Sequence, residues 1–252
     1  MVKHIYNLHR DKNPERDRLF IPRIDLATVP KSYDFRSQMP AVYDQGNYGS
    51  CTANAGAADW DWIFHREGGK YITPSRFYIY RNERDIDGSP AYEDAGSTGR
   101  TLMEAMTQFG VCPESMWSYT DEHFAEKPTK DCYAYGADHQ ALKHERVSQS
   151  KIMIEAAISQ DTPLCIGIAV YESFESEEAA STGYIPMPES YESLLGGHEV
   201  LMVGYNQDGG IIRNSWGASW GDKGYFYLPW DYLLYPELTF DFWALQKVET
   251  GE

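Results

Sequence analysis

The chain has 252 residues and a formal net charge of −16, with 42% hydrophobic, 14% aromatic and 24% charged residues. This length and composition indicate one large folded domain or two lobes, and they exclude the disordered and fibrous classes. The excess of acidic residues argues against a nucleic-acid partner, because like charges repel. No run of 18 apolar residues occurs, so the sequence predicts no membrane partner.

Cysteine usage and the first residues favour a reducing compartment. Four cysteines in a chain of this length do not make the disulfide framework of a small secreted protein. The first twelve residues lack the apolar run of a secretory signal peptide, and no Asn-x-Ser/Thr site for glycosylation occurs in the chain.

The chain begins with a polar segment and continues into a helical pattern. Residues 1–30 contain three prolines and carry six basic and four acidic side chains, so the rest of the chain carries a net charge of −18. We expect these residues to form an extended arm outside the core. After the glycine-rich turn at 45–50, small and aromatic residues recur every three to four positions over 51–64. This spacing predicts a helix that begins at Cys51.

The rest of the first half is predicted to be helical, and the second half to be rich in strands. Thr73 and Pro74 suit the N-cap and first position of a helix that reaches Arg81. Another helix is expected at 102–109, where Gly110 can end it. After a helix at 152–158, apolar runs predict strands. These strands lie at 164–170, 199–205, 211–213, 225–228 and 240–247, with a hairpin turn at 208–210.

Cys51 lies where a thiol can act as a nucleophile. In the first turn of a helix, unpaired N–H groups and the helix dipole stabilise a thiolate. The side-chain amide of Gln45, six residues upstream, and the backbone N–H of Cys51 can together bind the oxyanion of a tetrahedral intermediate. The alternative for Cys51 is a buried structural cysteine.

His198 is the candidate base for this thiol. It lies at the start of a predicted strand, where its ring can face a cleft, whereas the other six histidines are expected at the surface. The side chain of Asn214 can accept a hydrogen bond from the second ring nitrogen and fix the ring, and Trp216 can shield that bond from water. The alternatives are a structural histidine and a simple Asn-Ser-Trp-Gly turn.

These motifs resemble those of the papain-like cysteine peptidases, over about residues 30–247. The most specific stretch is Asn-Ser-Trp-Gly-x-x-Trp-Gly-x-x-Gly-Tyr at 214–225, followed by Gln-Gly-x-x-Gly-Ser-Cys at 45–51. The resemblance implies that Cys51 is the nucleophile, that His198 is the general base and then the acid, that Asn214 orients His198, and that Gln45 donates to the oxyanion. It also implies a resting thiolate–imidazolium pair, with the cysteine pKa depressed to about 3–4.

The resemblance implies an α+β, papain-like two-lobe fold with the active site in the cleft between the lobes. We expect an N-terminal arm or short prosegment at 1–30. A helical left lobe carrying the nucleophile is expected at 31–142. An antiparallel, β-barrel-like right lobe carrying the catalytic His and Asn is expected at 143–252.

The chain also departs from the family pattern. Tyr48 replaces the disulfide cysteine that usually lies three residues before the nucleophile, and Thr52 replaces the aromatic residue after it. The Cys-Asn-Gly-Gly segment is missing, and its nearest counterpart contains Gly96. We therefore expect Gly96, Gly197 and Trp216 to bind substrate. These changes are typical of a divergent microbial or viral-type branch, so we expect a cytoplasmic or virion- or host-associated protein.

The function predicted from the sequence is that of a cysteine-type endopeptidase. We expect a monomer that hydrolyses peptides or proteins through a Cys-His-Asn thioester mechanism, without a cofactor or metal. Residues 1–25, basic beside an acidic body, are expected to lie across or beside the cleft and to restrain activity, as in a zymogen, until they are cleaved or displaced. The alternative is a disordered or merely packed extension. The alternative functions are another thioester acyl transfer, amidase chemistry, or peptide binding by an inactive or autoinhibited homologue.

Two further features leave alternatives open. Cys112 and Cys132 can pair with each other, stay free, or join His123 and His139 around zinc, whereas the apolar surroundings of Cys165 indicate an inert core thiol. Residues 172–199 hold seven glutamates and no Lys or Arg. Such a run is usually a solvated loop, but at the rim of a cleft it would favour substrates with Lys or Arg near the scissile bond.

Overall fold

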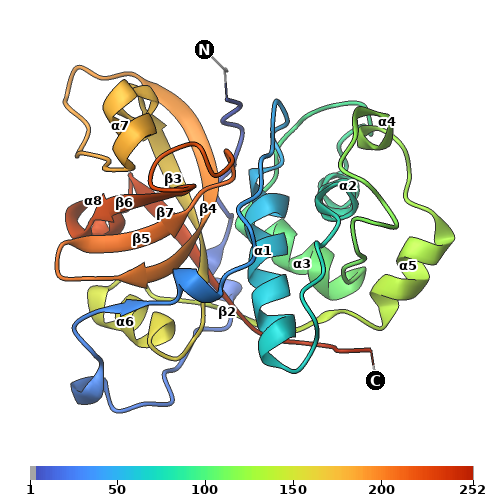
Figure 1. Ribbon diagram of the computed structural model, residues 1–252, viewed down its shortest axis with the longest axis horizontal. Coiled ribbons are helices and arrows are strands. Elements are labelled where there is room, and N and C mark those ends of the chain that lie inside the picture. The colour runs from blue at the N-terminus through green and yellow to red at the C-terminus, as the bar shows by residue number, and fades with distance from the viewer. Residues whose placement is uncertain (1–3, 252) are drawn as a thin grey trace.

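The computed structural model describes residues 4–251. A sheet and a group of helices lie on either side of the long helix α1, Cys51–Arg66 (Figure 1). The other helices are α2 (Arg76–Asp87), α3 (Gly99–Gln108), α4 (Asp121–Phe124), α5 (Lys130–Ala137), α6 (Lys151–Ile158), α7 (Glu177–Thr182) and α8 (Trp230–Leu234). The strands are β1 (Tyr33–Asp34), β2 (Ala141–Arg146), β3 (Leu164–Tyr171), β4 (Leu194–Tyr205), β5 (Gly209–Arg213), β6 (Tyr225–Pro229) and β7 (Thr239–Val248).

The strands form one antiparallel sheet of seven strands in the order β2-β7-β3-β4-β5-β6, with β1 also paired to β4. In the β3–β4 pair, Ile168 lies opposite His198 and Gly167 lies opposite Glu199. Helix α1 packs against β4, β7 and β3. The start of α1 and the middle of the sheet therefore meet where the two halves of the molecule join.

The sheet is open, whereas the sequence predicted a barrel-like lobe. In the described residues, β2 pairs with β7 and β6 pairs with β5, and these two edge strands do not pair with each other. Each edge is bridged by another segment instead: Leu19 bridges to Arg146, and Tyr184 bridges to Tyr227. Covered edges satisfy backbone groups without closing a barrel.

Helix boundaries follow the capping residues. Helix α1 begins at Cys51, as predicted. Helix α2 begins later than predicted, because Thr73 is not its cap: the Ser75 hydroxyl accepts a hydrogen bond from the Tyr78 amide at 3.1 Å. Pro74 lies in an extended bridge with Pro113, which delays the helix. Helix α3 ends before Gly110, whose φ of +67° is the left-handed value that a capping glycine adopts.

The sequence predicted an N-terminal arm outside the core, but in the structure part of the arm is buried. Leu8 and Phe20 are 7% and 5% exposed, and Phe20 belongs to the main hydrophobic core. These apolar side chains dock the arm because burying them removes apolar surface from water. The expected boundary between residues 142 and 143 falls within β2, and the three domain ranges stay a prediction.

Several histidines expected at the surface pack against aromatic rings instead. The rings of His139 and Tyr135 stack at 4.0 Å, and those of His4 and Trp216 stack at 3.9 Å. All four cysteines are buried free thiols. Within residues 4–251, no three His, Cys, Asp or Glu side chains cluster as metal ligands, and none of the helices is both long and apolar enough to span a membrane.

Four carboxyl groups lie in the interior in or near α1. Asp59, Asp61, Glu83 and Glu199 are each at most 1% exposed. Burial raises the pKa of Glu83 to about 8, although its carboxylate accepts a hydrogen bond from the Thr52 hydroxyl at 2.6 Å. Burial also raises the pKa of Asp59 and of Glu199 well above the ordinary range.

We expect these buried acids to make the protein less stable as the pH rises from 6.5 to 8. A carboxyl whose pKa is raised by folding stabilises the fold fully below its unfolded pKa, and that contribution is lost as the pH rises through the folded pKa. Each such group lowers the free energy of unfolding by up to about 1.4 kcal/mol per pH unit. The free energy of unfolding can be measured by urea unfolding at several pH values between 6.5 and 8. It should decline less steeply with pH in Glu83→Gln than in the wild type. The exposed control Glu122→Gln should keep the wild-type slope, and equal slopes in all three proteins would contradict the assignment to Glu83.

Candidate active site

His198 and Asn214 form a buried pair beneath an indole ring. The ring Nε2 of His198 lies 2.9 Å from the Asn214 side-chain oxygen, so Nε2 carries the proton and donates it. Asn214 is held just after β5, where its backbone amide donates to the Gly224 carbonyl at 2.9 Å. The rings of Trp216 and His198 stack at 5.0 Å. Trp216 therefore lies against the imidazole of the pair, and its shielding of the hydrogen bond from water stays a prediction.

Cys51 lies beside this pair at the start of α1. The backbone amides of Thr52 and Glu199 approach the Cys51 sulfur, and both act to lower the pKa of the thiol. Because Glu199 follows His198 directly in β4, this contact brings the thiol to the same end of the cleft as the imidazole. The other ring nitrogen of His198, Nδ1, has no hydrogen-bond partner among residues 4–251.

Gln45 ties the turn before α1 to the loop that carries Asn214. Its side-chain oxygen accepts a hydrogen bond from the Ser215 hydroxyl at 2.5 Å, and its amide nitrogen donates to the Tyr48 carbonyl at 2.8 Å. Its backbone amide donates to the Ser215 carbonyl at 2.8 Å. One side-chain N–H of Gln45 is left for another acceptor, because an amide group carries two donors.

The protonation states differ from those implied by the family resemblance. Burial raises the pKa of the Cys51 thiol to about 12, and burial lowers the pKa of His198 to about 4. Both shifts favour the neutral form, because a buried charge loses its hydration. The thiol and imidazole are therefore neutral here, rather than a thiolate–imidazolium pair.

The N-terminal arm is what buries the pair. The ring of His4 stacks on Trp216, and the ring of Tyr6 meets that of His198 edge-on at 6.1 Å. Further along the arm, the Leu8 amide donates to the Gly197 carbonyl at 3.2 Å. Leu8 and Cys51 also belong to one buried cluster with Phe240. The arm thus runs across the cleft from Trp216 to Cys51.

Glycines on both walls let the arm approach closely. A Cβ at Gly96 would lie 2.0 Å from the Asn7 carbonyl oxygen, and one at Gly197 would lie 2.6 Å from that of Leu8. Any other residue at these positions would displace the arm. The sequence predicted Gly96 and Gly197 as substrate-binding residues, and the structure places both against an extended peptide, which is the chain's own arm.

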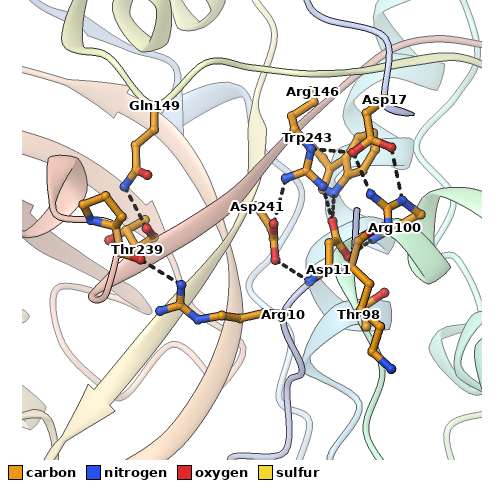
Figure 2. A network of polar contacts seen from close by, with 12 residues as sticks. Arg10, Asp11, Asp17, Thr98, Arg100, Arg146, Gln149, Thr239, Asp241 and Trp243 are labelled. Atoms are coloured by element: carbon orange, nitrogen blue, oxygen red, sulfur yellow. Dashed lines mark hydrogen bonds and ion pairs between the residues drawn. The ribbon is translucent and has the colours of Figure 1, made fainter. Parts of the chain in front are cut away.

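An ionic network anchors the arm beyond the cleft (Figure 2). Arg146 of β2 contacts Asp11, Asp17 and Asp241 at 2.5–2.7 Å, and Arg100 of α3 contacts Asp17 at 2.7 Å. We call these five residues the latch. Two of its acids belong to the arm, so the latch joins the arm to the helices and to the sheet at once.

The sequence placed residues 1–25 across or beside the cleft but did not single out those that cover the site, namely His4, Tyr6 and Leu8, nor did it single out Glu199. Tyr6 and Leu8 lie two residues apart, which places both on one face of an extended segment, and this spacing is the signal that could have found them. Glu199 differs in sequence context from the six other glutamates of 172–199, which are exposed or partly exposed, because it alone lies in a predicted strand, 199–205. That position is the signal that could have indicated its burial.

Comparison with known proteins decides the family. Residues 29–232 match the model of the papain family cysteine proteases. The chain belongs to the papain family of cysteine peptidases. It is therefore a hydrolase with protein substrates and the α+β fold of that family.

Relatives of this peptidase come from a virus, a protist and a bacterium. A mimivirus protein described as an uncharacterized peptidase C1-like protein is 37% identical, over 81% of this chain and 69% of the relative. A cathepsin B-like protein of Giardia intestinalis is 30% identical, over 84% and 74%. The structure of xylellain, a cysteine protease from Xylella fastidiosa, superposes with a TM-score of 0.90 at 33% identity, covering 97% of this chain and 96% of that one.

We expect the thiol of this peptidase to be unreactive at the pH where an exposed thiolate–imidazolium pair reacts. With a pKa near 12, Cys51 is almost wholly protonated at pH 6, and its thiolate fraction rises tenfold per pH unit. Alkylation of the native full chain by limiting iodoacetamide, followed by mass mapping, should be slow at pH 5–6 and accelerate above pH 8. Rapid, pH-independent labelling of Cys51 at pH 5–6 would contradict a covered, neutral thiol.

Proposed function

We propose that this peptidase cleaves internal peptide bonds through a thioester on Cys51, with His198, Asn214 and Gln45 completing the site. The observation that carries the proposal is the 2.9 Å bond between His198 Nε2 and Asn214, which leaves Nδ1 without a hydrogen-bond partner among residues 4–251. A base fixed in this tautomer can accept the thiol proton at Nδ1.

The proposed cycle balances protons and bonds. The Cys51 proton moves to His198 Nδ1 as the sulfur attacks the peptide carbonyl carbon. The backbone N–H of Cys51 and the free side-chain N–H of Gln45 donate to the resulting oxyanion. The C–N bond then breaks as Nδ1 protonates the leaving amine, and water hydrolyses the thioester with His198 again acting as base.

Action on internal bonds is supported by the path of the arm. The extended segment from His4 to Asp11 crosses the site and continues past the nucleophile on both sides. A cleft that accommodates a continuous chain in this way has room for a substrate on both sides of the scissile bond. Gly96, Gly197 and Trp216, which contact the arm, are proposed to contact such a substrate.

The acidic net charge of the chain supports a monomer without a nucleic-acid partner, and the proposed cycle needs no cofactor.

The arm is proposed to restrain activity, as in a zymogen. A substrate cannot reach Cys51 while Tyr6 and Leu8 occupy the cleft, because the thiol is 1% exposed. The neutral state of the pair adds a chemical restraint to this steric one, since the thiolate is the nucleophile.

Replacing Gln45 with Ala should lower turnover by about 10²–10³, which is the usual cost of removing one oxyanion donor. The comparison is best made in the latch variant described next, where the cleft is open. Steady-state hydrolysis of a fluorogenic peptide measures the effect, and circular dichroism checks that the variant is folded. A rate within threefold of the parent would remove Gln45 from the mechanism.

Opening the latch should raise activity. In the double variant Asp11→Asn, Asp17→Asn, Arg146 loses two of its carboxylates, and a broken buried ion pair costs about 3–5 kcal/mol. We therefore expect at least a tenfold increase in fluorogenic peptide turnover by the full chain. The matched control Glu15→Gln changes an exposed acid of the same arm and should leave the rate unchanged. Equal rates for all three proteins would reject restraint by the arm.

A further inference from the structure

The side chain of Leu8 is buried near Cys51, and the space that it occupies is called the pocket below. Leu8, Phe240 and Cys51 form one buried cluster, and the Leu8 Cδ2 atom lies 3.0 Å from where a Cβ would stand on Gly167. Gly167 is directly opposite Glu199 in the β3–β4 register. Side chains of directly opposed residues lie on the same face of a sheet, with Cβ atoms about 5 Å apart. Leu8 and the side chain of Glu199 therefore share one face of the sheet, where the missing side chain of Gly167 makes space for Leu8 and the Phe240 ring.

The Glu199 carboxyl in this pocket lacks a hydrogen-bond partner. Both of its oxygens are buried, and neither has a partner among residues 4–251. One of them lies 3.4 Å from where a Cβ would stand on Gly99, at the start of α3. The other three buried acids in or near α1 differ from Glu199, because each accepts a hydrogen bond. Glu83 accepts from Thr52, Asp59 from Cys165 and Asp61 from the Ile72 amide. An acid that is buried without a donor needs an explanation.

The charges around Glu199 favour the arrival of a cation. Asp11, Asp241 and Glu83 act together with burial to raise the pKa of Glu199, whereas Arg146 opposes them. Arg146 is already in contact with three carboxylates of the latch. The pocket therefore holds an excess of acids over bases, and its wall at Glu199 offers only acceptors once the carboxyl is ionised.

We propose that Glu199 is a specificity-determining residue that selects Lys or Arg in the peptide side chain that takes the place of Leu8. This inference rests on the proposed function, since it describes the substrates of the same cleft. A leucine is too short and too apolar to satisfy the carboxyl, whereas an ammonium or guanidinium group supplies several donors and the opposite charge. The arm, with leucine at this position, fills the pocket without pairing the acid, so basic peptides are the better ligands.

The arm itself provides the test, because residue 8 can be changed in the full chain. We compare Leu8→Lys with Leu8→Met, a neutral control of similar length, each with Glu199 intact and with Glu199→Gln. The readout is the rate at which iodoacetamide labels Cys51 at pH 8, which reports how often the arm leaves the cleft and requires no peptidase turnover. Leu8→Lys should be labelled at least tenfold more slowly than Leu8→Met when Glu199 is intact. This advantage should vanish in Glu199→Gln, and equal labelling of the Lys and Met variants with Glu199 intact would overturn the proposal.

A second measurement uses substrates and the latch variant Asp11→Asn, Asp17→Asn. A positional library of fluorogenic peptides with Lys, Arg, Leu or Met fixed at each position in turn should show one position where the basic residues raise kcat/KM at least tenfold. Glu199→Gln should abolish that preference and retain cleavage of the leucine peptides. A preference that survives in Glu199→Gln would also overturn the proposal. If no peptide is cleaved while the labelling pattern holds, the proposed function fails and the pocket assignment stands.

Discussion

The exclusion of water from Cys51 and His198 is the constraint on which the rest of the structure depends. A thiolate and an imidazolium are stable together only where their charges are hydrated or paired, and the arm removes the water without supplying a charge to replace it. The thiol, with a pKa near 12, and the imidazole, with a pKa near 4, consequently stay neutral. The same side chains that block the cleft, Tyr6 and Leu8, thus also suppress the nucleophile.

The sequence indicated where the candidate residues lie better than it indicated their protonation states. Cys51, His198 and Asn214 lie in local patterns that specify their own surroundings: the head of a helix, a buried strand and a rigid turn. Their protonation depends on residues far away in the chain, such as Leu8, whose contact with Cys51 no local pattern encodes. Desolvation is a property of the whole assembled cleft. For this reason the pKa of the Cys51 thiol is raised, whereas the family resemblance implies that it is lowered.

The fold shows the same division between local and distant determinants. The first residue of α1 could be predicted, because a glycine-rich turn and the spacing of small residues both mark it. The start of α2 could not, because Pro74 is held extended by a bridge to Pro113, which is distant in sequence. The open sheet has a similar cause: its edges are covered by segments around Leu19 and Tyr184 that carry no strand pattern.

The contacts that cover the cleft and those that anchor the arm are separate, and this separation determines how the arm can be displaced. The latch acids lie at Asp11 and Asp17, whereas the cleft is filled by residues 4–8. Residues 4–8 can leave while the latch holds, so the arm acts as a tethered competitor with an effective concentration on the order of millimolar. A peptide must exceed that competition through its own contacts. The arm fills the pocket beside the unpaired acid Glu199 with leucine, which does not pair with that acid. The arm therefore binds this pocket less tightly than a peptide with a basic side chain at the same place would.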